Sequence, residues 1–179
     1  MIITGEQNEL LRGMIPFIFK DKNRGNLNCF RSESGTTVAT DGKRIAITTR
    51  NILPDGNWRV VKSLKKQTEL EKVDGEYPNW RQVVPDKVPE IHRLSTANGG
   101  RYEEQEASIY LCLHGLFTDE NGRRCAIDHA FVWGVMQLAN AANRKAITVH
   151  QHDAYTPRLF DMGDVKAIVM PLWMGRNEQ

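Results

Sequence analysis

Two histidines near the C-terminal end are the side chains best suited to metal chemistry. His150 and His152 stand two apart on a predicted strand, so both side chains point to the same side of it, and Asp153 follows. Together with His129 elsewhere in the chain, this set has the donor types that bind transition metals. Two histidines on an exposed strand are far more common without a metal. A metal-binding enzyme that uses His150 and His152 is therefore only a remote alternative.

The cysteines and the local motifs give no reason to expect covalent catalysis. Cys112 and Cys125 fall on predicted strands and are interpreted as small core residues rather than nucleophiles. The sequence lacks the GxSxG and HExxH motifs, the phosphate-binding loop and the dinucleotide-binding fingerprint. We therefore predict that the protein is not an enzyme, and we expect no catalytic residue, no metal and no cofactor.

The composition indicates a soluble, cytoplasmic, globular protein. Hydrophobic residues make up 40% and charged residues 26% of the 179 residues, which is typical of a packed chain rather than a disordered one. Three cysteines without CxxC spacing indicate reduced thiols. No apolar run approaches the ~20 residues that cross a membrane, and the start lacks the pattern of a secretory signal. The net charge of +2 is small for a protein that holds DNA by charge alone.

The first part of the chain predicts one helix followed by three strands. Thr4 and Gln7 have the spacing of a capping box, and Pro16 should end the helix. Apolar residues at helical spacing fall between these two signals: Leu10, Leu11 and Met14. Strands are predicted at 27–31, 36–40 and 44–49, with turns at Ser34-Gly35 and Asp41-Gly42 between them.

The last part of the chain repeats this order of elements. Asp128 is a suitable N-cap for an apolar-faced helix that Asn143 closes. Strands are predicted at 146–151, 157–160 and 165–170, and short strands precede each helix at 1–4 and 124–127. In the middle we predict a strand at 58–62, a polar and helical segment at 63–72, a long loop at 87–106, a strand at 109–113 and a hairpin turn at Asn121-Gly122.

Three segments are more specific than the pattern around them. They read VATDGKRIA (38–46), VDGEYPNWRQVVP (73–85) and KAIVMPL (166–172). Together, and in this order, they resemble the β subunit of bacterial DNA polymerase III, the sliding clamp. That family has an ATDG-x-R-hydrophobic-A segment in its second domain and a DG-x-[FY]-P-[DN]-[FYW]-x-x-[VI]-[LIV]-P segment where the second domain passes into the third. It ends in a hydrophobic run followed by MPM or a near variant.

The resemblance covers about residues 1–50, 73–85 and 124–172 and leaves 86–123 unexplained. The first half looks like the start of the family's second domain, and the last half looks like the end of its third. The resemblance implies an α+β fold: a DNA-clamp-like domain with two helix-plus-antiparallel-strands halves and the helices on one face of the sheets. We expect a single domain over 1–179, with a first half at 1–62, a linker and insert at 63–123, and a second half at 124–174.

In the family, the three segments line a pocket that captures short, mostly apolar peptides. The resemblance therefore implies a peptide-binding site made of Thr40, Gly42, Lys43, Arg44, Ile45, Pro78, Val83, Ile168, Met170, Pro171 and Leu172. These residue types suit that role. Several are apolar, Met170 adapts to different ligand side chains, and Lys43 and Arg44 can bond carbonyl or acidic groups. A compact apolar pocket with few polar groups is what a peptide anchor requires.

The resemblance implies a non-enzymatic clamp-like protein whose partners carry the clamp-binding motifs of a DNA polymerase, clamp loader or repair protein. Oligomerisation on duplex DNA as a processivity factor is a further expectation, with weak support. Arg12 is a lone cation on the first helix, and Lys62, Lys65 and Lys66 form the densest basic cluster. The DNA-binding residues stay unknown. A ring would require a large homo-oligomer, and the alternative is a decoy or regulator of the replication machinery that forms no ring.

Overall fold

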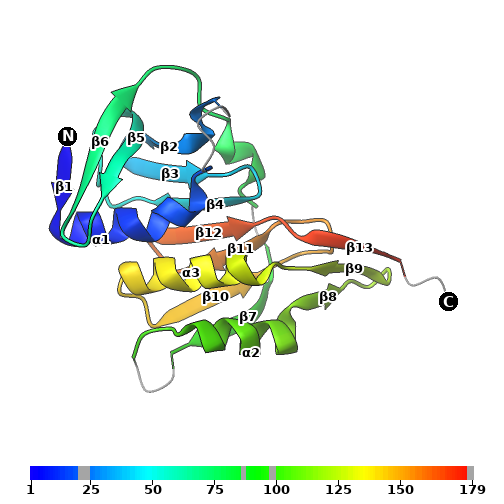
Figure 1. The fold of residues 1–179 in the computed structure, drawn as a ribbon. Helices are drawn as coiled ribbons and strands as arrows, with labels where there is room; N and C mark the ends of the chain where they lie inside the picture. The colour runs from blue at the N-terminus through cyan, green and yellow to red at the C-terminus, as the bar shows by residue number, and fades with distance from the viewer. Residues whose placement is uncertain (20–24, 86–87, 97–99, 177–179) are drawn as a thin grey trace.

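The computed structural model describes residues 1–19, 25–85, 88–96 and 100–176. Most strands form one curved sheet of ten (Figure 1). Their order is β1 (Ile2–Thr4), β6 (Gln67–Val73), β5 (Gly56–Ser63), β2 (Cys29–Glu33), β3 (Thr36–Thr40), β4 (Arg44–Thr48), β12 (Val165–Val169), β11 (Arg158–Asp161), β10 (Ala146–His150) and β7 (Glu90–Ser95). A smaller sheet holds β13 (Leu172–Arg176), β9 (Arg123–Ala126) and β8 (Leu116–Thr118). Every strand pair in the two sheets is antiparallel.

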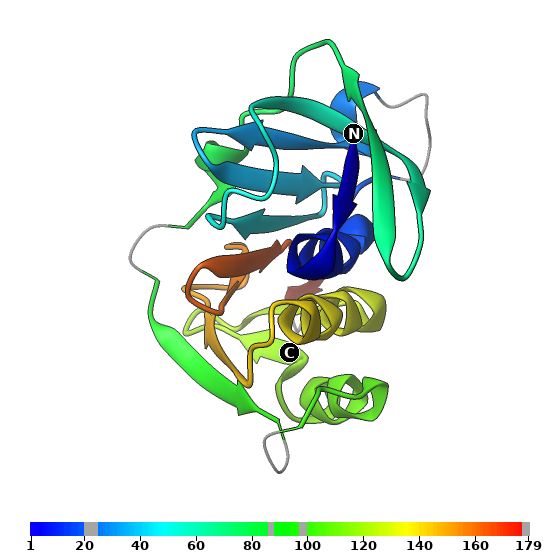
Figure 2. The ribbon, with the colours of Figure 1, turned by 90° about the vertical axis from the view of Figure 1, so that its left-hand side faces the viewer.

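Three helices cover one face of the large sheet, as the two views show (Figures 1 and 2). They are α1 (Gly5–Met14), α3 (His129–Ala141) and α2 (Glu104–His114), with α3 packed between the other two. Each half therefore has the predicted helix and antiparallel strands, and the helices lie on one face. None of the helices in the described ranges has the length and apolar character needed to span a membrane.

The helix boundaries follow from local signals. Thr4 takes the extended N-cap conformation before α1, although its side chain makes no capping hydrogen bond, so the predicted capping box does not form. Asp128 caps α3 by accepting a hydrogen bond from the Ala130 amide at 2.7 Å. Asn143 follows α3 in the left-handed region, at φ 56°, which ends the helix as predicted.

The two halves meet at the centre of the large sheet, where β4 pairs with β12. Ala46 lies opposite Ala167, and both are fully buried under the helices. The ends of these strands are tied by Asp164, whose carboxylate accepts from Arg50 at 2.8 Å and also pairs with Arg144. These hydrogen bonds, followed by the positive charges of Arg50 and Arg144, hold the pKa of Asp164 below its usual value. One continuous sheet and one ion-pair cluster therefore join the N-terminal and C-terminal halves.

The middle of the chain differs from the sequence prediction in three places. The strand predicted at 109–113 is wrong, because this segment lies in α2. Glu103 and Glu106 form a capping box that starts this helix, and its buried residues, Ala107 and Tyr110, are three apart rather than two. Because Cys112 lies on α2 and is exposed, its interpretation as a core residue is also wrong; Cys125 is buried on β9 as predicted.

The other two differences concern strands. The segment 63–72, predicted as helical, contains β6, where Thr68 and Leu70 are buried two residues apart. The loop predicted at 87–106 contains β7 and the start of α2. Tertiary pairing with β10 forms β7 from the sequence EIHRLS, which has little strand signal of its own.

A buried arginine holds α2 against the sheet. Arg158 on β11 is completely buried, and it donates to the Gln151 side chain at 2.6 Å, the Tyr110 hydroxyl at 2.9 Å and the His114 carbonyl oxygen at 2.9 Å. Burial raises the pKa of Tyr110, while the charge of Arg158 opposes that shift. Among the described residues, no carboxylate forms an ion pair with Arg158. Its charge is thus met by neutral acceptors and the C-terminal end of α2.

Candidate peptide-binding site

An apolar cluster covers the face of the large sheet opposite the helices. Because strand residues alternate between faces, side chains of β3, β4, β11 and β12 meet on this outer face: Val38, Ile45, Ile47, Leu159 and Ile168. Ile45 lies directly opposite Ile168 across the β4–β12 pair, and both are buried. The first and second halves of the chain therefore contribute to one apolar floor.

The segment 74–85, which we call the strap, crosses this floor on the outside. Tyr77, Trp80 and Val84 pack against the outer cluster. The start of the strap is fixed by side-chain amides, since Asn57 donates to the Gly75 carbonyl oxygen at 2.7 Å and Asn26 donates to that of Glu76 at 2.8 Å. The Tyr77 hydroxyl reaches the Val38 carbonyl oxygen at 3.5 Å, and burial raises the pKa of Tyr77. The strap is thus an ordered part of the site.

The turn between β3 and β4 is held by its own side chains. The Asp41 carboxylate accepts from the amides of Lys43 and Arg44 at 2.9 and 3.0 Å, and the Thr40 hydroxyl accepts from the Gly42 amide at 3.1 Å. Gly42 is at φ 85°, a conformation that favours glycine. This geometry leaves Gly42 and Lys43 exposed at the end of the floor.

The C-terminal segment joins this turn directly. The Met170 amide donates to the Lys43 carbonyl oxygen at 2.8 Å, so Met170 and Lys43 are neighbours. Val83 on the strap, and Met170 and Leu172 after β12, are 39%, 39% and 47% exposed. Pro78 is also exposed, and Pro171 is half-buried. A buried apolar floor with exposed apolar side chains at its rim can accept an apolar ligand by burying the surface that remains.

Arg44 is the predicted site residue that points elsewhere. Its guanidinium group lies on the helix side, where it donates to the Pro16 carbonyl oxygen at 2.6 Å and to the Asp41 carboxylate at 2.9 Å. It also stacks on Phe131 with 4.5 Å between the guanidinium carbon and the ring centroid. The structure therefore places Ile45 and Ile168 in the outer cluster, whereas Leu172 begins β13 of the smaller sheet opposite Ala126. Arg44 connects the β3–β4 turn with the helix layer.

Sequence reasoning missed part of the site. Val38 and Ile47 alternate with the predicted residues Thr40 and Ile45, so the two-residue period of a strand could have identified them. Trp80 and Val84 belong to the recognised linker segment, but their contacts with the floor depend on the path of the strap. Leu159 could be assigned to this face only from the register of β11 with β12, which cannot be derived from the sequence alone.

A cavity lies beside the strap, between the strap and β2. It has a volume of about 450 Å³ and is lined by strap residues together with Arg31 and Glu33 of β2. Arg81 bridges the two elements, since its guanidinium group is 3.4 Å from the Glu33 carboxylate and stacks on Trp80. The outer face therefore combines an apolar floor with a neighbouring polar hollow.

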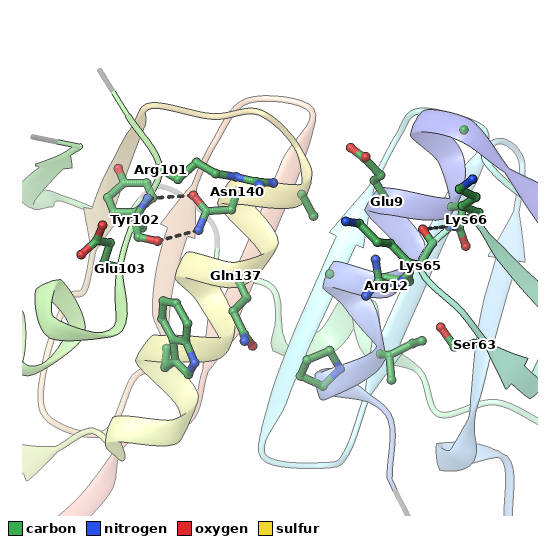
Figure 3. Close-up of a pocket in the computed structure, with 17 residues that line it drawn as sticks. Glu9, Arg12, Ser63, Lys65, Lys66, Arg101, Tyr102, Glu103, Gln137 and Asn140 are labelled. Carbon is green, nitrogen blue, oxygen red and sulfur yellow. Dashed lines mark hydrogen bonds between the residues drawn. The ribbon is translucent and has the colours of Figure 1, made fainter. Parts of the chain in front are cut away.

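The helix face carries a separate, basic groove of about 1140 Å³. Figure 3 shows its two walls facing each other, one from α1 and the β5–β6 turn and the other from α3 and the segment 101–103. The charged residues that line it are Glu9, Arg12, Lys65, Lys66, Arg101 and Glu103. Arg12 and two of the three clustered lysines of the sequence thus reach one groove, whereas Lys62 does not line it.

The histidines of the metal hypothesis do not lie on one strand. His150 ends β10, and its Nδ1 atom is 3.0 Å from the Val88 carbonyl oxygen, whereas His152 lies in the following loop with its imidazole 3.7 Å from the Asp153 carboxylate. Within the described ranges, no group of three or more His, Cys, Asp or Glu residues is arranged to hold a metal ion.

Solved structures with the same arrangement of elements are bacterial sliding clamps. The DNA polymerase sliding clamp of Pseudomonas aeruginosa is 13% identical and matches with a TM-score of 0.59 over 97% of this chain and 66% of its own. The Helicobacter pylori β clamp bound to a DNA ligase peptide is 14% identical, with a TM-score of 0.59 over 96% of this chain and 64% of its own.

A third match, a putative DNA polymerase III β subunit from Eubacterium rectale, is 12% identical, with a TM-score of 0.60 over 96% of this chain and 65% of its own. The chain thus spans about two thirds of the length of these proteins. No protein-family model matches the sequence, and no curated protein matches it. These matches, which cover nearly the whole chain, show that this protein has the fold of the bacterial DNA polymerase III β sliding clamps.

Proposed function

We propose that the protein is a clamp-like binding module that captures short hydrophobic peptide motifs of replication and repair proteins on the outer face. The observation that carries this proposal is the common floor made by Ile45 and Ile168, followed along the chain by the exposed side chains of Met170 and Leu172. A clamp with the same fold is bound to a DNA ligase peptide, which supports a peptide as the ligand.

The chemistry of the rim indicates how such a peptide binds. Two apolar ligand side chains would cover Val83, Met170 and Leu172, and burying one large apolar side chain contributes about 1.5–3 kcal/mol. Lys43 is the exposed cation at the end of the floor, where it can bond a carbonyl or carboxylate of the peptide. The partners would carry the clamp-binding motifs of a DNA polymerase, clamp loader or repair protein.

A fluorescent peptide of the Gln-Leu-x-Leu-Phe type tests this proposal by polarisation titration. We expect saturable binding near the micromolar range, weakened at least about 10-fold by Met170→Asp or Leu172→Asp, because each places a charge where the peptide buries apolar surface. Both side chains are substantially exposed, so the variants should fold. Leu64→Asp, on the β5–β6 turn at 44% exposure, is the matched control and should bind like the unmodified protein.

Two results would contradict the proposed peptide-binding site. Absence of binding by protein with a normal unfolding transition would contradict the proposal. Equal weakening by the rim variants and by Leu64→Asp would show that the peptide adheres to apolar surface in general.

A second candidate function is contact with duplex DNA through the groove on the helix face. Four cations and two carboxylates line it, which leaves an excess of positive charge. Phosphate contacts make affinity fall with salt, with a slope of about −0.9 per neutralised phosphate. We therefore expect Lys65→Gln together with Lys66→Gln to reduce the slope of log affinity against log salt by about 2 for a short duplex. Lys62→Gln is the control, and an unchanged slope in the double variant would exclude these contacts.

The two functions predict different roles. Peptide capture with DNA contact fits a processivity factor, which would oligomerise on DNA. Peptide capture without DNA contact fits a decoy or regulator that competes with a replicative clamp for its partners. The peptide and DNA titrations together distinguish these roles.

A further inference from the structure

A buried asparagine connects α1 to the β5–β6 hairpin. Asn8 is 1% exposed, and both ends of its side-chain amide have partners on the hairpin. Its Nδ2 atom donates to the Lys65 carbonyl oxygen at 3.1 Å, and its Oδ1 atom accepts from the Thr68 hydroxyl at 2.7 Å. A buried amide requires such partners, and asparagine is a poor residue for the interior of a helix. Packing alone therefore does not account for an asparagine at this position.

The same network includes the base of the hairpin turn. Ser63 and Thr68 lie opposite each other at the end of the β5–β6 pairing, with their hydroxyl oxygens 3.2 Å apart. Because the Thr68 hydroxyl has one hydrogen and donates it to Asn8, Ser63 is the donor to Thr68. β1 also holds this end of β6, since Ile3 pairs with Thr68. The base of the turn is therefore fixed by strand pairing as well as by side chains.

The tip of the turn has less support from its own conformation. Lys65 and Lys66 lie between Leu64 and Gln67, where the Leu64 amide donates to the Gln67 carbonyl oxygen at 2.8 Å. The favoured two-residue hairpin turns have positive φ at their central positions. Lys65 and Lys66 are not among the described residues with positive φ. The Asn8 amide thus supplies a hydrogen bond from outside the hairpin to a turn that lacks the favoured geometry.

The two lysines and Arg12 belong to one wall of the basic groove. Arg12 follows Asn8 by four residues on α1, which places the two residues on the same side of the helix. Lys65 and Lys66 come from the turn that Asn8 holds (Figure 3). The cations of this wall therefore come from two elements, and the hydrogen bond from Asn8 to Lys65 is a direct link between them.

We propose that Asn8 is a positioning residue, which fixes Lys65 and Lys66 relative to Arg12 so that the three cations meet the same segment of phosphate backbone. This inference rests on the proposed contact of the groove with DNA. A lysine side chain is a flexible stem that carries a point charge, so the position of its backbone decides which phosphates it reaches. A turn that moves spreads these charges over a larger volume and loses phosphate contacts. Asn8 is buried and acts only through the turn.

The salt dependence of binding to a short fluorescent DNA duplex, measured with the full chain, tests this role. We expect Asn8→Ala to reduce the slope of log affinity against log salt by about 1, because one of the two lysines loses its phosphate contact. In protein that already carries Lys65→Gln and Lys66→Gln, Asn8→Ala should have no further effect on the slope, since the side chains through which it acts are gone.

Ser32→Ala is the matched control for destabilisation. Ser32 is also fully buried, and its hydroxyl donates to the Leu53 carbonyl oxygen at 2.7 Å, at a place that does not line the groove. It should shift the midpoint of urea unfolding about as much as Asn8→Ala and leave the salt slope unchanged. Amide hydrogen exchange adds a measurement without DNA. The Leu64 amide should exchange faster in Asn8→Ala than in Ser32→Ala, because only the first variant releases the turn.

These measurements distinguish failure of the inference from failure of the groove function. An unchanged slope in the double lysine variant would exclude the groove as a DNA site and overturn both. A reduced slope in that variant with an unchanged slope in Asn8→Ala would overturn only the role of Asn8, as would equal exchange of the Leu64 amide in the two alanine variants. An equal loss of slope with Ser32→Ala would assign the effect to general destabilisation.

Discussion

Replacing Arg158 by leucine is expected to lower the free energy of unfolding by about 3 kcal/mol. The side chain is fully buried, so the substitution leaves the Gln151 side chain, the Tyr110 hydroxyl and the His114 carbonyl oxygen without their donor. Each unsatisfied buried group costs about 1–3 kcal/mol, and relief of the buried charge offsets part of the sum. Urea unfolding measures the change as a shift in midpoint at constant slope.

Tyr110→Phe is the matched control for this prediction, because it removes one of the three hydrogen bonds and keeps the ring. We expect a loss of about 1 kcal/mol. If Arg158→Leu lowers the free energy of unfolding by less than Tyr110→Phe does, the cost of burying the Arg158 charge cancels the stabilisation from its hydrogen bonds.

Replacing Arg44 by methionine is expected to destabilise the fold by about 2 kcal/mol while changing the peptide affinity of folded protein less than about twofold. The guanidinium group connects the β3–β4 turn to the carbonyl oxygens of Pro16 and Ala130 and contacts the ring of Phe131. Methionine keeps much of the apolar contact but leaves both carbonyl groups unpaired. Urea unfolding gives the stability, and the polarisation titration gives the affinity.

Lys43→Met is the comparison variant, since Lys43 is exposed beside Arg44 and faces the proposed ligand. It should leave stability within about 0.5 kcal/mol, as for most surface substitutions. Weakened peptide binding by Arg44→Met at full stability would instead make Arg44 a ligand contact.

The sequence was most informative where a local signal and a tertiary contact agree. The turn at Asp41-Gly42 and the cap at Asp128 are determined by residues within a few positions, and both occur as predicted. It was least informative in the segment that carries β7 and α2. There, pairing with β10 and the anchoring of Tyr110 by Arg158 determine the structure, and neither contact leaves a local pattern.

The candidate site shows the same contrast between features set by local sequence and features set by tertiary contacts. The linear motifs identified Ile45 and Ile168 as parts of one site, and the register of β4 with β12 places them opposite each other. The direction of the Arg44 side chain depended on the positions of Pro16 and Ala130, which are distant in sequence. Residue type and spacing therefore identified the surface of the sheet, whereas the face used by each charged side chain required the fold.

The pairing of β4 with β12 has a consequence for synthesis of the chain on the ribosome. Residues 44–48 emerge long before residues 165–169, so the β4 edge of the N-terminal half stays unpaired, and Ile45 lacks its partner Ile168, until the C-terminal strand has been synthesised. Contacts this far apart in sequence also slow folding. A nascent chain that stalls before residue 165 should therefore be the species most prone to aggregate or to require a chaperone.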